Sequence, residues 1–294
     1  ANYYVGNALH HVMRYRYAYK RAGMYGLTME KDAGEPVGKR GFYPYDYLSG
    51  YVLLRPREKN WSFALGDYNV WSGNGLLLGR RIFSGRVAEA RPTRNTLGAF
   101  RAHTSTDEAD FFRGAVGAWR WKGIDIMAFA SYRKVDARLS NASSDTVTTL
   151  LQSGLHRTLS EIEARRTMGN FTAGWHWGIN QKHWGLATDG VWTHFNKYVS
   201  PVKRWYNANY FRGQTARSLS ASYYIEFSKL YVQGDVSTDR NWHIATIHRL
   251  LYVPVRCLRL GLQYRQFSPR YVSLYGKALQ QGSRVSNEQG MLCN

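Results

Sequence analysis

Carboxyl groups and one histidine gather in two long stretches of the chain that lack regular patterning. These groups are Asp107, Glu108, Asp110, His156, Glu161 and Glu163. Carboxyl and imidazole side chains act as general acids and bases when a fold brings them together. Stretches of this length also supply such groups by chance, so the pattern alone predicts no catalytic site and the chain is not expected to be an enzyme.

Other residue types that could do chemistry have simpler explanations. Gly73-Asn74-Gly75 lacks the Gly-Lys-Ser/Thr of a phosphate loop and predicts a tight bend. His176 and His194 lie in strand-like stretches, where wall positions are expected rather than metal ligands. Cys257 and Cys293 show neither metal-ligand spacing nor a disulfide framework. We therefore expect no metal and no cofactor.

The segment 12–20 sorts its side chains with a period of two. One face receives Met13, Tyr15, Tyr17 and Tyr19, and the other receives Arg14, Arg16 and Lys20. A strand places alternate residues on opposite faces, which a helix cannot do. Base stacking with phosphate contacts is disfavoured for the same reason, because the aromatic and basic side chains point apart.

The alternation recurs along the chain, and the connections between its copies alternate in length. The clearest copies lie at 61–66, 170–180, 218–227, 230–237 and 258–265. Short connections fall at 22–23, 56–60, 122–123, 181–183, 228–229 and 254–257. The intervening ones are mostly long, at 33–44, 67–110, 134–168, 196–214 and 268–289. Short turns on one rim and long loops on the other are typical of an outer-membrane barrel.

The predicted fold is therefore an all-β, antiparallel transmembrane β-barrel that occupies residues 1–294, with no separate soluble domain. About twelve complete strands are expected here, and about fourteen in a full barrel whose two ends are trimmed in this chain. Mean hydropathy is −0.47, and no apolar run approaches the roughly 18 residues of a transmembrane helix. A soluble β-sandwich fits less well, because its outward face would be polar.

On this fold, the aromatic and aliphatic face is expected to contact lipid. The predicted lipid-facing residues are Tyr15, Tyr17, Trp175, Trp177, Tyr223, Phe227, Leu260 and Leu262. An arginine placed at Leu260 or Phe227 at mid-membrane should cost about 2 to 4 kcal/mol of stability.

The excess of positive charge requires anionic surroundings. Lys and Arg number 40 against 20 Asp and Glu, a net charge of +20. The predicted lumen-facing basic residues are Arg14, Arg16, Lys20, Arg259 and Arg265, with Glu30 as the acidic partner of Arg14 and Arg16. Outer-leaflet lipopolysaccharide or a partner is expected to contact Arg80, Arg81, Arg86, Arg91, Arg94 and Arg101. That these arginines are only solvated, or that they plug the lumen by pairing with its acids, is an equal alternative.

Several segments resemble a family of Bacteroidota outer-membrane proteins described as helix-hairpin-helix domain proteins, in which small periplasmic modules precede a large barrel. The matching segments are EKDAGEP (30–36), GDYNVWSGNGLLLGR (66–80), STDEADFFRG (105–114), SYRKVDARL (131–139), SGLHRTLSEI (153–162) and SPRYVSLYGKAL through NEQG (268–290). The resemblance implies a barrel without a defined activity. No helix-hairpin-helix module is visible in this sequence.

The predicted function is that of a porin-like outer-membrane barrel of a Gram-negative cell. It would act either as a pore or as a platform subunit of an envelope complex in transport, secretion or outer-membrane biogenesis. Inward arginines support the pore, because they would concentrate anions. Long loops that could plug the lumen or dock another outer-membrane or periplasmic subunit support the platform. A soluble basic nucleic-acid-binding protein and an outer-membrane enzyme are the alternatives, and solubility without detergent would favour the former.

Overall fold

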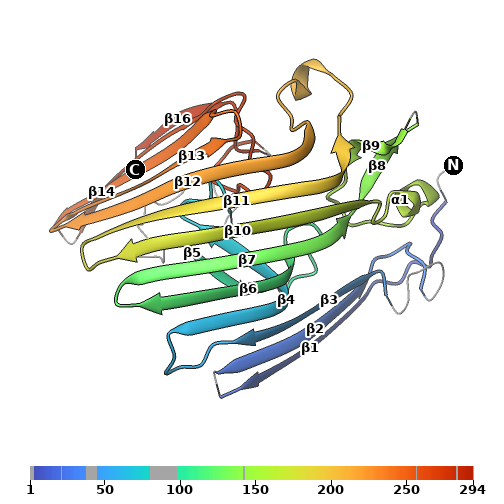
Figure 1. Ribbon diagram of the computed structural model, residues 1–294, viewed down its shortest axis with the longest axis horizontal. Coiled ribbons are helices and arrows are strands. Elements are labelled where there is room, and N and C mark those ends of the chain that lie inside the picture. Colours follow the sequence, from blue (N-terminus) through green and yellow to red (C-terminus); the bar gives the residue numbers. More distant parts are fainter. Residues whose placement is uncertain are drawn as a thin grey trace.

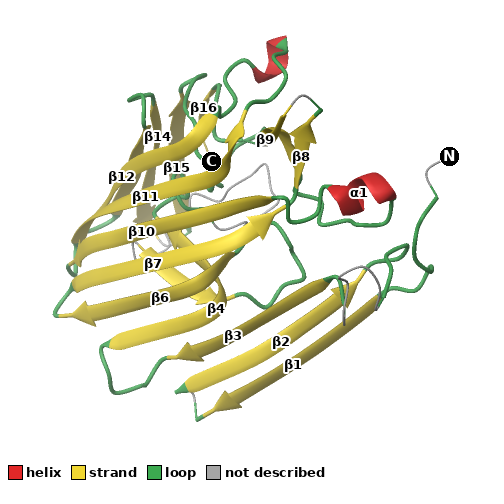
Figure 2. Cartoon of the chain, turned by 45° about the vertical axis from the view of Figure 1, so that its right-hand side comes forward, coloured by secondary structure: helices red, strands yellow, loops and turns green. Residues whose placement is uncertain are grey.

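The computed structural model describes residues 3–20, 22–37, 45–79, 98–141, 143–255, 257–282 and 284–293. Strands make up nearly all of its regular structure, as Figure 2 shows. The two helical segments in these ranges are α1 (Leu159–Glu163) and η1 (Trp205–Asn207). Neither is long and apolar enough to cross a membrane.

One curved, barrel-like sheet contains every strand of the described residues (Figure 1). Its neighbouring strands run β1 (His11–Tyr19), β2 (Gly23–Lys31), β3 (Tyr47–Leu54), β4 (Trp61–Ser72), β6 (Phe112–Trp121), β7 (Ile124–Val135), β10 (Met168–Asn180), β11 (Trp184–Val199), β12 (Gly213–Phe227), β13 (Leu230–Asp239), β14 (Ile244–Val255), β15 (Leu258–Phe267) and β16 (Glu288–Cys293). All neighbours on this path are antiparallel. The predicted all-β antiparallel class, with about twelve complete strands before a final partial one, is confirmed.

Three further strands lie off this path, in stretches that the sequence predicts as loops. They are β5 (Gly98–Ala102), β8 (Ala137–Ser140) and β9 (Ser143–Leu150). β5 pairs with the far end of β4, β8 pairs with β9, and β9 makes a short parallel pairing with β11. The loop prediction was wrong at these positions because the segments lack a regular alternation of apolar and polar residues; β9, for example, has only Val147 and Leu150 as apolar residues.

β1 and β16 are not neighbours in the described residues, so the sheet is open between them. Closure by about fourteen strands stays a prediction. The two rims differ as the sequence predicts: short turns join strands along the left rim of Figure 1, whereas α1, β8, β9 and most long connections lie along the right rim.

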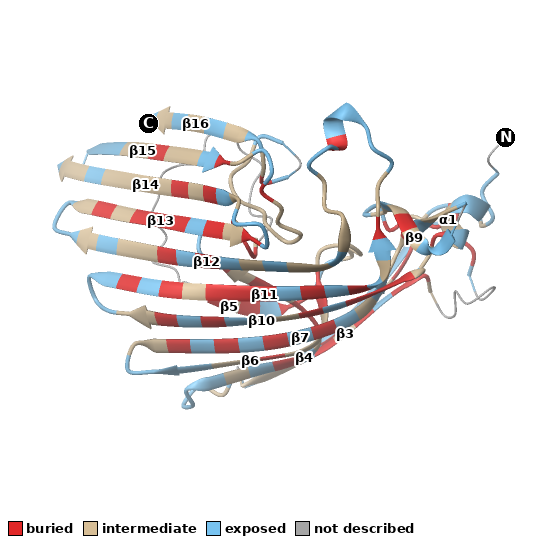
Figure 3. Cartoon of the chain, turned by 45° about the horizontal axis from the view of Figure 1, so that its top comes forward, coloured by how far each residue is buried: buried red, intermediate tan, exposed pale blue. Residues whose placement is uncertain are grey.

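The two faces of the sheet differ in chemistry, and the burial pattern alternates along the strands (Figure 3). On β10, Trp175 is 45% exposed and its neighbour His176 is 1% exposed. On β11, Leu186 is 45% exposed whereas Asp189 is fully buried. Apolar side chains therefore cover the convex face, while polar groups face the concave side. An apolar surface of this extent is unfavourable in contact with water but favourable in contact with lipid.

Aromatic residues form two rows on the convex face. One row follows the short-turn rim and includes Trp61, Trp119, Trp121, Trp177 and Trp184; the other includes Tyr132, Phe171 and Trp192. On β11, Trp184 and Trp192 are eight residues apart, or about 27 Å along a strand. With a barrel tilt of about 40°, this separation spans roughly 20 Å of membrane depth, close to the apolar band of outer-membrane barrels.

Candidate functional site

The concave side is filled by two segments of the chain itself. The first, called the inner hairpin, consists of Tyr68–Ser72 of β4, the residues to 79 and β5. β4 separates from β3 after Gly66, whose φ is +96° and whose Cβ, if present, would lie 2.2 Å from the carbonyl oxygen of Gly50; its pairing with β6 ends at Tyr68. Only glycine fits both that backbone and that contact. Figure 1 places β5 behind the strands of the wall, on the concave side.

Apolar burial holds the inner hairpin in place. Leu76, Leu77 and Leu78 are 1 to 2% exposed. Leu77, Leu78 and Phe100 pack in one cluster with wall residues that include Val116 and Phe129. Each fully buried leucine contributes about 1.5 to 3 kcal/mol relative to an exposed one. The described residues of the inner hairpin, which belong to the long connection 67–110, therefore lie inside the barrel. This connection does not only extend outward from the rim.

The second segment, called the return segment, is Ser268–Gly276 after β15. Its Tyr271 hydroxyl lies 2.8 Å from Ser237 Oγ on the wall and 3.2 Å from the Leu76 carbonyl oxygen. The Tyr275 hydroxyl lies 2.7 Å from Thr172 Oγ1, and Tyr275 forms a parallel bridge with Leu78. The return segment therefore ties the inner hairpin to the opposite wall, and the two segments form one plug.

Inward acids of the wall are paired within the wall or with the plug. Asp67 accepts two hydrogen bonds from Arg113, at 2.7 and 2.8 Å. Asp189 contacts His176 Nδ1 at 2.7 Å. Asp235 accepts from the backbone N–H of Asn74 in the inner hairpin. Pairing of this kind lowers the cost of burying carboxylates and fixes where the plug sits.

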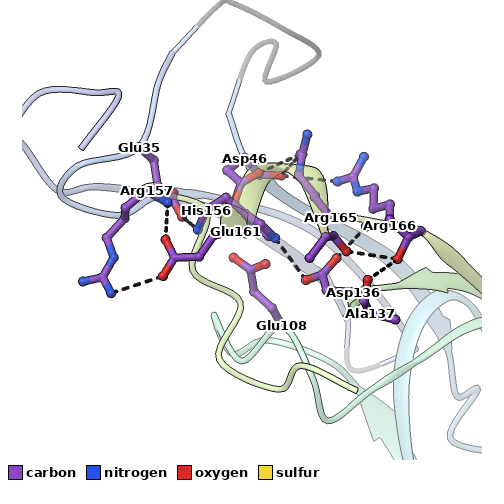
Figure 4. A network of polar contacts seen from close by, with 12 residues as sticks. Glu35, Asp46, Glu108, Asp136, Ala137, His156, Arg157, Glu161, Arg165 and Arg166 are labelled. Atoms are coloured by element: carbon purple, nitrogen blue, oxygen red, sulfur yellow. Dashed lines mark hydrogen bonds and ion pairs between the residues drawn. The ribbon is translucent and has the colours of Figure 1, made fainter. Parts of the chain in front are cut away.

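A buried polar cluster, called the rim cluster, joins two long connections at the long-loop rim, the one between β2 and β3 and the one between β7 and β10 (Figure 4). His156 Nδ1 lies 2.5 Å from Asp46 Oδ2, and its Nε2 lies 3.1 Å from Asp136 Oδ2. The backbone N–H of His156 donates to Glu35 at 2.8 Å, and Arg165 contacts Asp46 at 2.7 Å. With both ring nitrogens facing carboxylates, the imidazole is held as a cation, which leaves it no lone pair for base catalysis.

The rim cluster alters the acidity of its members. Burial alone would lower the pKa of His156, but hydrogen bonds and charges of Asp136 and Asp46 outweigh it and raise the pKa to about 10. Burial, assisted by the charge of Asp46, raises the pKa of Glu108 to about 9. Glu35, Asp46 and His156 offer ligand atoms within 4.8 Å of one another, as do His10, Glu30 and Asp32. Glu35, Asp46 and His156 already use ligand atoms in the hydrogen bonds and ion pairs described above.

We expect His156→Leu to release the two connections from each other, because Asp46 and Asp136 would then face each other without the cation between them. Loss of one partner of a buried ion pair costs about 3 kcal/mol or more. Hydrogen exchange of the amides in 136–166 should accelerate on the order of 100-fold. The matched control is His194→Leu, since His194 is exposed and contacts Thr215 at 3.2 Å. If the amides of residues 136–166 exchange at the same rate in both variants, the rim cluster does not hold the connections together.

Raising the pH should loosen the same connections. The protonated forms of His156 and Glu108 are both favoured in the folded state. The stabilisation from His156 is complete below its unfolded pKa near 6.5 and is lost as pH rises through about 10; the cost from Glu108 grows between about pH 4.5 and 9. Exchange in 136–166 should therefore accelerate from pH 6 to 10 beyond its intrinsic increase. Glu108→Gln should flatten that dependence, whereas the exposed Glu163→Gln should not.

No protein-family model and no curated protein matches the chain. Among solved structures, a mutant porin of Rh. blastica matches at 10% identity and a TM-score of 0.29, covering 90% of this chain and 84% of that chain. A second variant of the same porin matches at 9% identity with the same TM-score and coverage. The fold described above rests on the strand pairing and not on these similarities.

The predicted inward arginines lie on the concave face, but their predicted partner does not bind them. Arg14 and Arg16 are opposite Thr28 and Gly26, on the face of Glu30. Glu30 contacts His10 Nε2 at 3.0 Å instead, because the register places Val12 opposite Glu30. The expected ion pairs of Glu30 with Arg14 and Arg16 are absent from the described residues.

The other predicted basic residues have different surroundings. Lys20 lies in the turn after β1, with its Nζ 5.2 Å from the Tyr19 ring centroid. Arg265 pairs with Glu288 at 2.5 Å, while Arg259 is exposed. Of the predicted lipopolysaccharide contacts, Arg80, Arg81, Arg86, Arg91 and Arg94 lie outside the described residues. Arg101 belongs to β5 of the inner hairpin, which places it on the concave side and away from the outer leaflet.

The predicted lipid-facing residues lie on the convex face, but at different heights. Trp175, Trp177 and Leu260 are 45, 41 and 47% exposed. The other members of the set are Tyr15, Tyr17, Tyr223, Phe227 and Leu262, on β1, β12 and β15. Phe227 is the last residue of β12, beside a two-residue turn, so it lies at the rim and not at the predicted mid-membrane depth.

Proposed function

We propose that the chain is an outer-membrane β-barrel whose lumen is closed by its own plug, and that it serves as a platform subunit of a cell-envelope complex. The plug is the observation that supports this role over an open pore. Leu76, Leu78 and Tyr271 are almost completely buried on the concave side, where a diffusion pore would hold water. The convex aromatic rows support membrane insertion.

The lengths of the connections at the two rims indicate how the barrel is oriented in the membrane. Outer-membrane barrels keep short turns in the periplasm and long loops outside the cell. The rim cluster and α1 would then face the exterior, and the turns near Lys20, Gly123 and Ser228 would face the periplasm. Lipopolysaccharide and outer-membrane lipid would surround the convex face, and no nucleic acid is expected to bind.

Extraction from native membranes tests the platform role. The chain should purify with one or more further subunits in a fixed stoichiometry, and the complex should survive size-exclusion chromatography in mild detergent. A chain that purifies alone, or that stays in solution without detergent, would contradict the proposal.

A further inference from the structure

Three side chains that belong to neither the plug nor the rim cluster meet at the long-loop end of the first hairpin. They are His10, just before β1, and Glu30 and Asp32, at the end of β2. His10 Nε2 lies 3.0 Å from Glu30 Oε1 and 3.6 Å from Asp32 Oδ1. The register explains the meeting: it places Val12 opposite Glu30, so positions 10, 30 and 32 share one face of the hairpin.

The main chain before His10 is fixed to the end of β2. Lys31 is 1% exposed, and its Nζ donates to the carbonyl oxygens of Leu9 at 2.6 Å and Asn7 at 3.3 Å. The same Nζ donates to the carbonyl oxygen of Asp32 at 3.0 Å. Backbone contacts therefore hold His10 near Asp32, and the ammonium group of Lys31 is occupied by carbonyl groups.

The two carboxylates have one basic partner, the imidazole of His10, in the part of the chain that the structure describes. Glu30 is 9% exposed, and no Lys or Arg of the described residues lies within 4.0 Å of Glu30 or Asp32. Burial of a carboxylate without a counter-charge is costly. The Nε2 atom carries at most one hydrogen, so it cannot fully satisfy both acids, whereas one metal ion can accept lone pairs from all three side chains.

The spacing and the chemistry of these groups fit a transition-metal ion. Bonds of about 2.0 to 2.2 Å from one ion place neighbouring ligand atoms roughly 3.0 to 3.6 Å apart. The three ligand atoms lie within 4.8 Å of one another. An imidazole nitrogen beside two carboxylates suits Zn²⁺ or a related ion better than Ca²⁺ or Mg²⁺, which prefer oxygen ligands throughout. The His10 side chain is 51% exposed, so a further coordination position would be open to solvent.

We propose that His10, Glu30 and Asp32 bind a divalent transition-metal ion of the Zn²⁺ class, which joins the segment before β1 to the end of β2. The site does not depend on the proposed plug or on the orientation in the membrane, because all three ligands belong to one hairpin and its flanks. Sequence spacing predicts no metal here, since 20 residues separate His10 from Glu30 and only strand pairing brings them together.

The test uses the full chain in detergent micelles, without a histidine tag. The exposed Cys257 and Cys293 are first replaced by serine, because thiolates bind the same ions. Titration with Co²⁺, a coloured substitute for Zn²⁺, should give a visible absorption that saturates at equimolar ion and that Zn²⁺ removes. His10→Ala and Asp32→Asn should each weaken Co²⁺ binding at least about tenfold, since loss of a group that only orients a metal ligand already costs roughly 10- to 100-fold.

The matched control is His11→Ala. His11 is exposed and adjacent to His10, but it lies opposite Lys31 and its side chain alternates to the other face of the hairpin. This variant should bind Co²⁺ as the unaltered chain does. Zn²⁺ should also slow hydrogen exchange of the amides of residues 7–11 in the chain that retains Asp32 but not in Asp32→Asn.

No saturable Co²⁺ absorption, equal weakening by His11→Ala, or undiminished binding by His10→Ala would each overturn the site. Binding that is lost in His156→Leu but kept in His10→Ala would place the ion at the rim cluster instead. Displacement of Co²⁺ by an equal concentration of Mg²⁺ would contradict the assigned metal class, since an all-oxygen site would then be present. Circular dichroism of each variant reports whether the sheet is intact.

Discussion

The unaltered chain should show no stepwise ion conductance in planar bilayers, and removal of the inner hairpin should create it. In the altered chain, a short Gly-Ser linker replaces residues 70–101, while Asn69 remains to contact His103 at 3.0 Å. The deletion empties the part of the barrel now filled by Leu76–Leu78 and Phe100. Conductance should rise at least roughly tenfold over the background leak, because an open barrel of this size holds water.

The control for this deletion is a linker of similar composition in place of residues 202–210. That segment contains η1 and the 91% exposed Trp205, and the concave-side clusters contain none of its residues. The chain with this control linker should show no stepwise conductance. An unaltered chain that conducts anions, and loses that preference when Arg14, Arg16 and Arg265 are neutralised, would restore the pore interpretation and reject the plug.

Leu219→Arg should destabilise the inserted barrel by about 2 to 4 kcal/mol, whereas Phe227→Arg should cost about 0 to 1 kcal/mol. Leu219 is 48% exposed on β12 and lies opposite Gly190, between the levels of Trp184 and Trp192 on β11. Phe227 is more exposed but lies at the rim. The difference arises because an arginine at the rim can reach water and headgroups.

Urea unfolding in lipid vesicles measures both variants under the same conditions. A conservative pair, Leu219→Ala and Phe227→Ala, separates lost apolar area from the cost of the charge. If both arginine variants cost the same amount, the aromatic rows do not bound the membrane and the assigned depth of β12 is wrong.

The wall could be predicted from the sequence because each strand carries its own signal. Alternation at 12–20 or 218–227 requires only neighbouring residues, and one lipid-exposed face makes the period visible. The plug gave a weaker signal, since the run Leu76–Leu78 within a supposed outer loop is apolar enough to suggest burial but does not say where.

The rim cluster was beyond sequence reasoning for a different reason. Asp46 lies in the β2–β3 connection, whereas Asp136 and His156 lie in the β7–β10 connection, and only the folded sheet brings these two connections together. In the sequence, His156 and Glu108 are separate loop residues, and no pattern connects them with Glu35, Asp46 or Asp136. The predicted pairing of Glu30 with Arg14 does not form because of the strand register. Val12, two residues before Arg14 on β1, lies opposite Glu30.

Spin-label accessibility shows whether the convex face contacts lipid while loops close the concave side. The exposed Cys257 and Cys293 are first replaced by serine, and single cysteines are then introduced at Leu186, Leu219 or Trp205. In liposomes, labels at Leu186 and Leu219 should collide with oxygen far more than with a water-soluble nickel complex, and the label at Trp205 should show the reverse. Nickel access at Leu219 equal to that at Trp205 would place the convex face in water rather than in lipid.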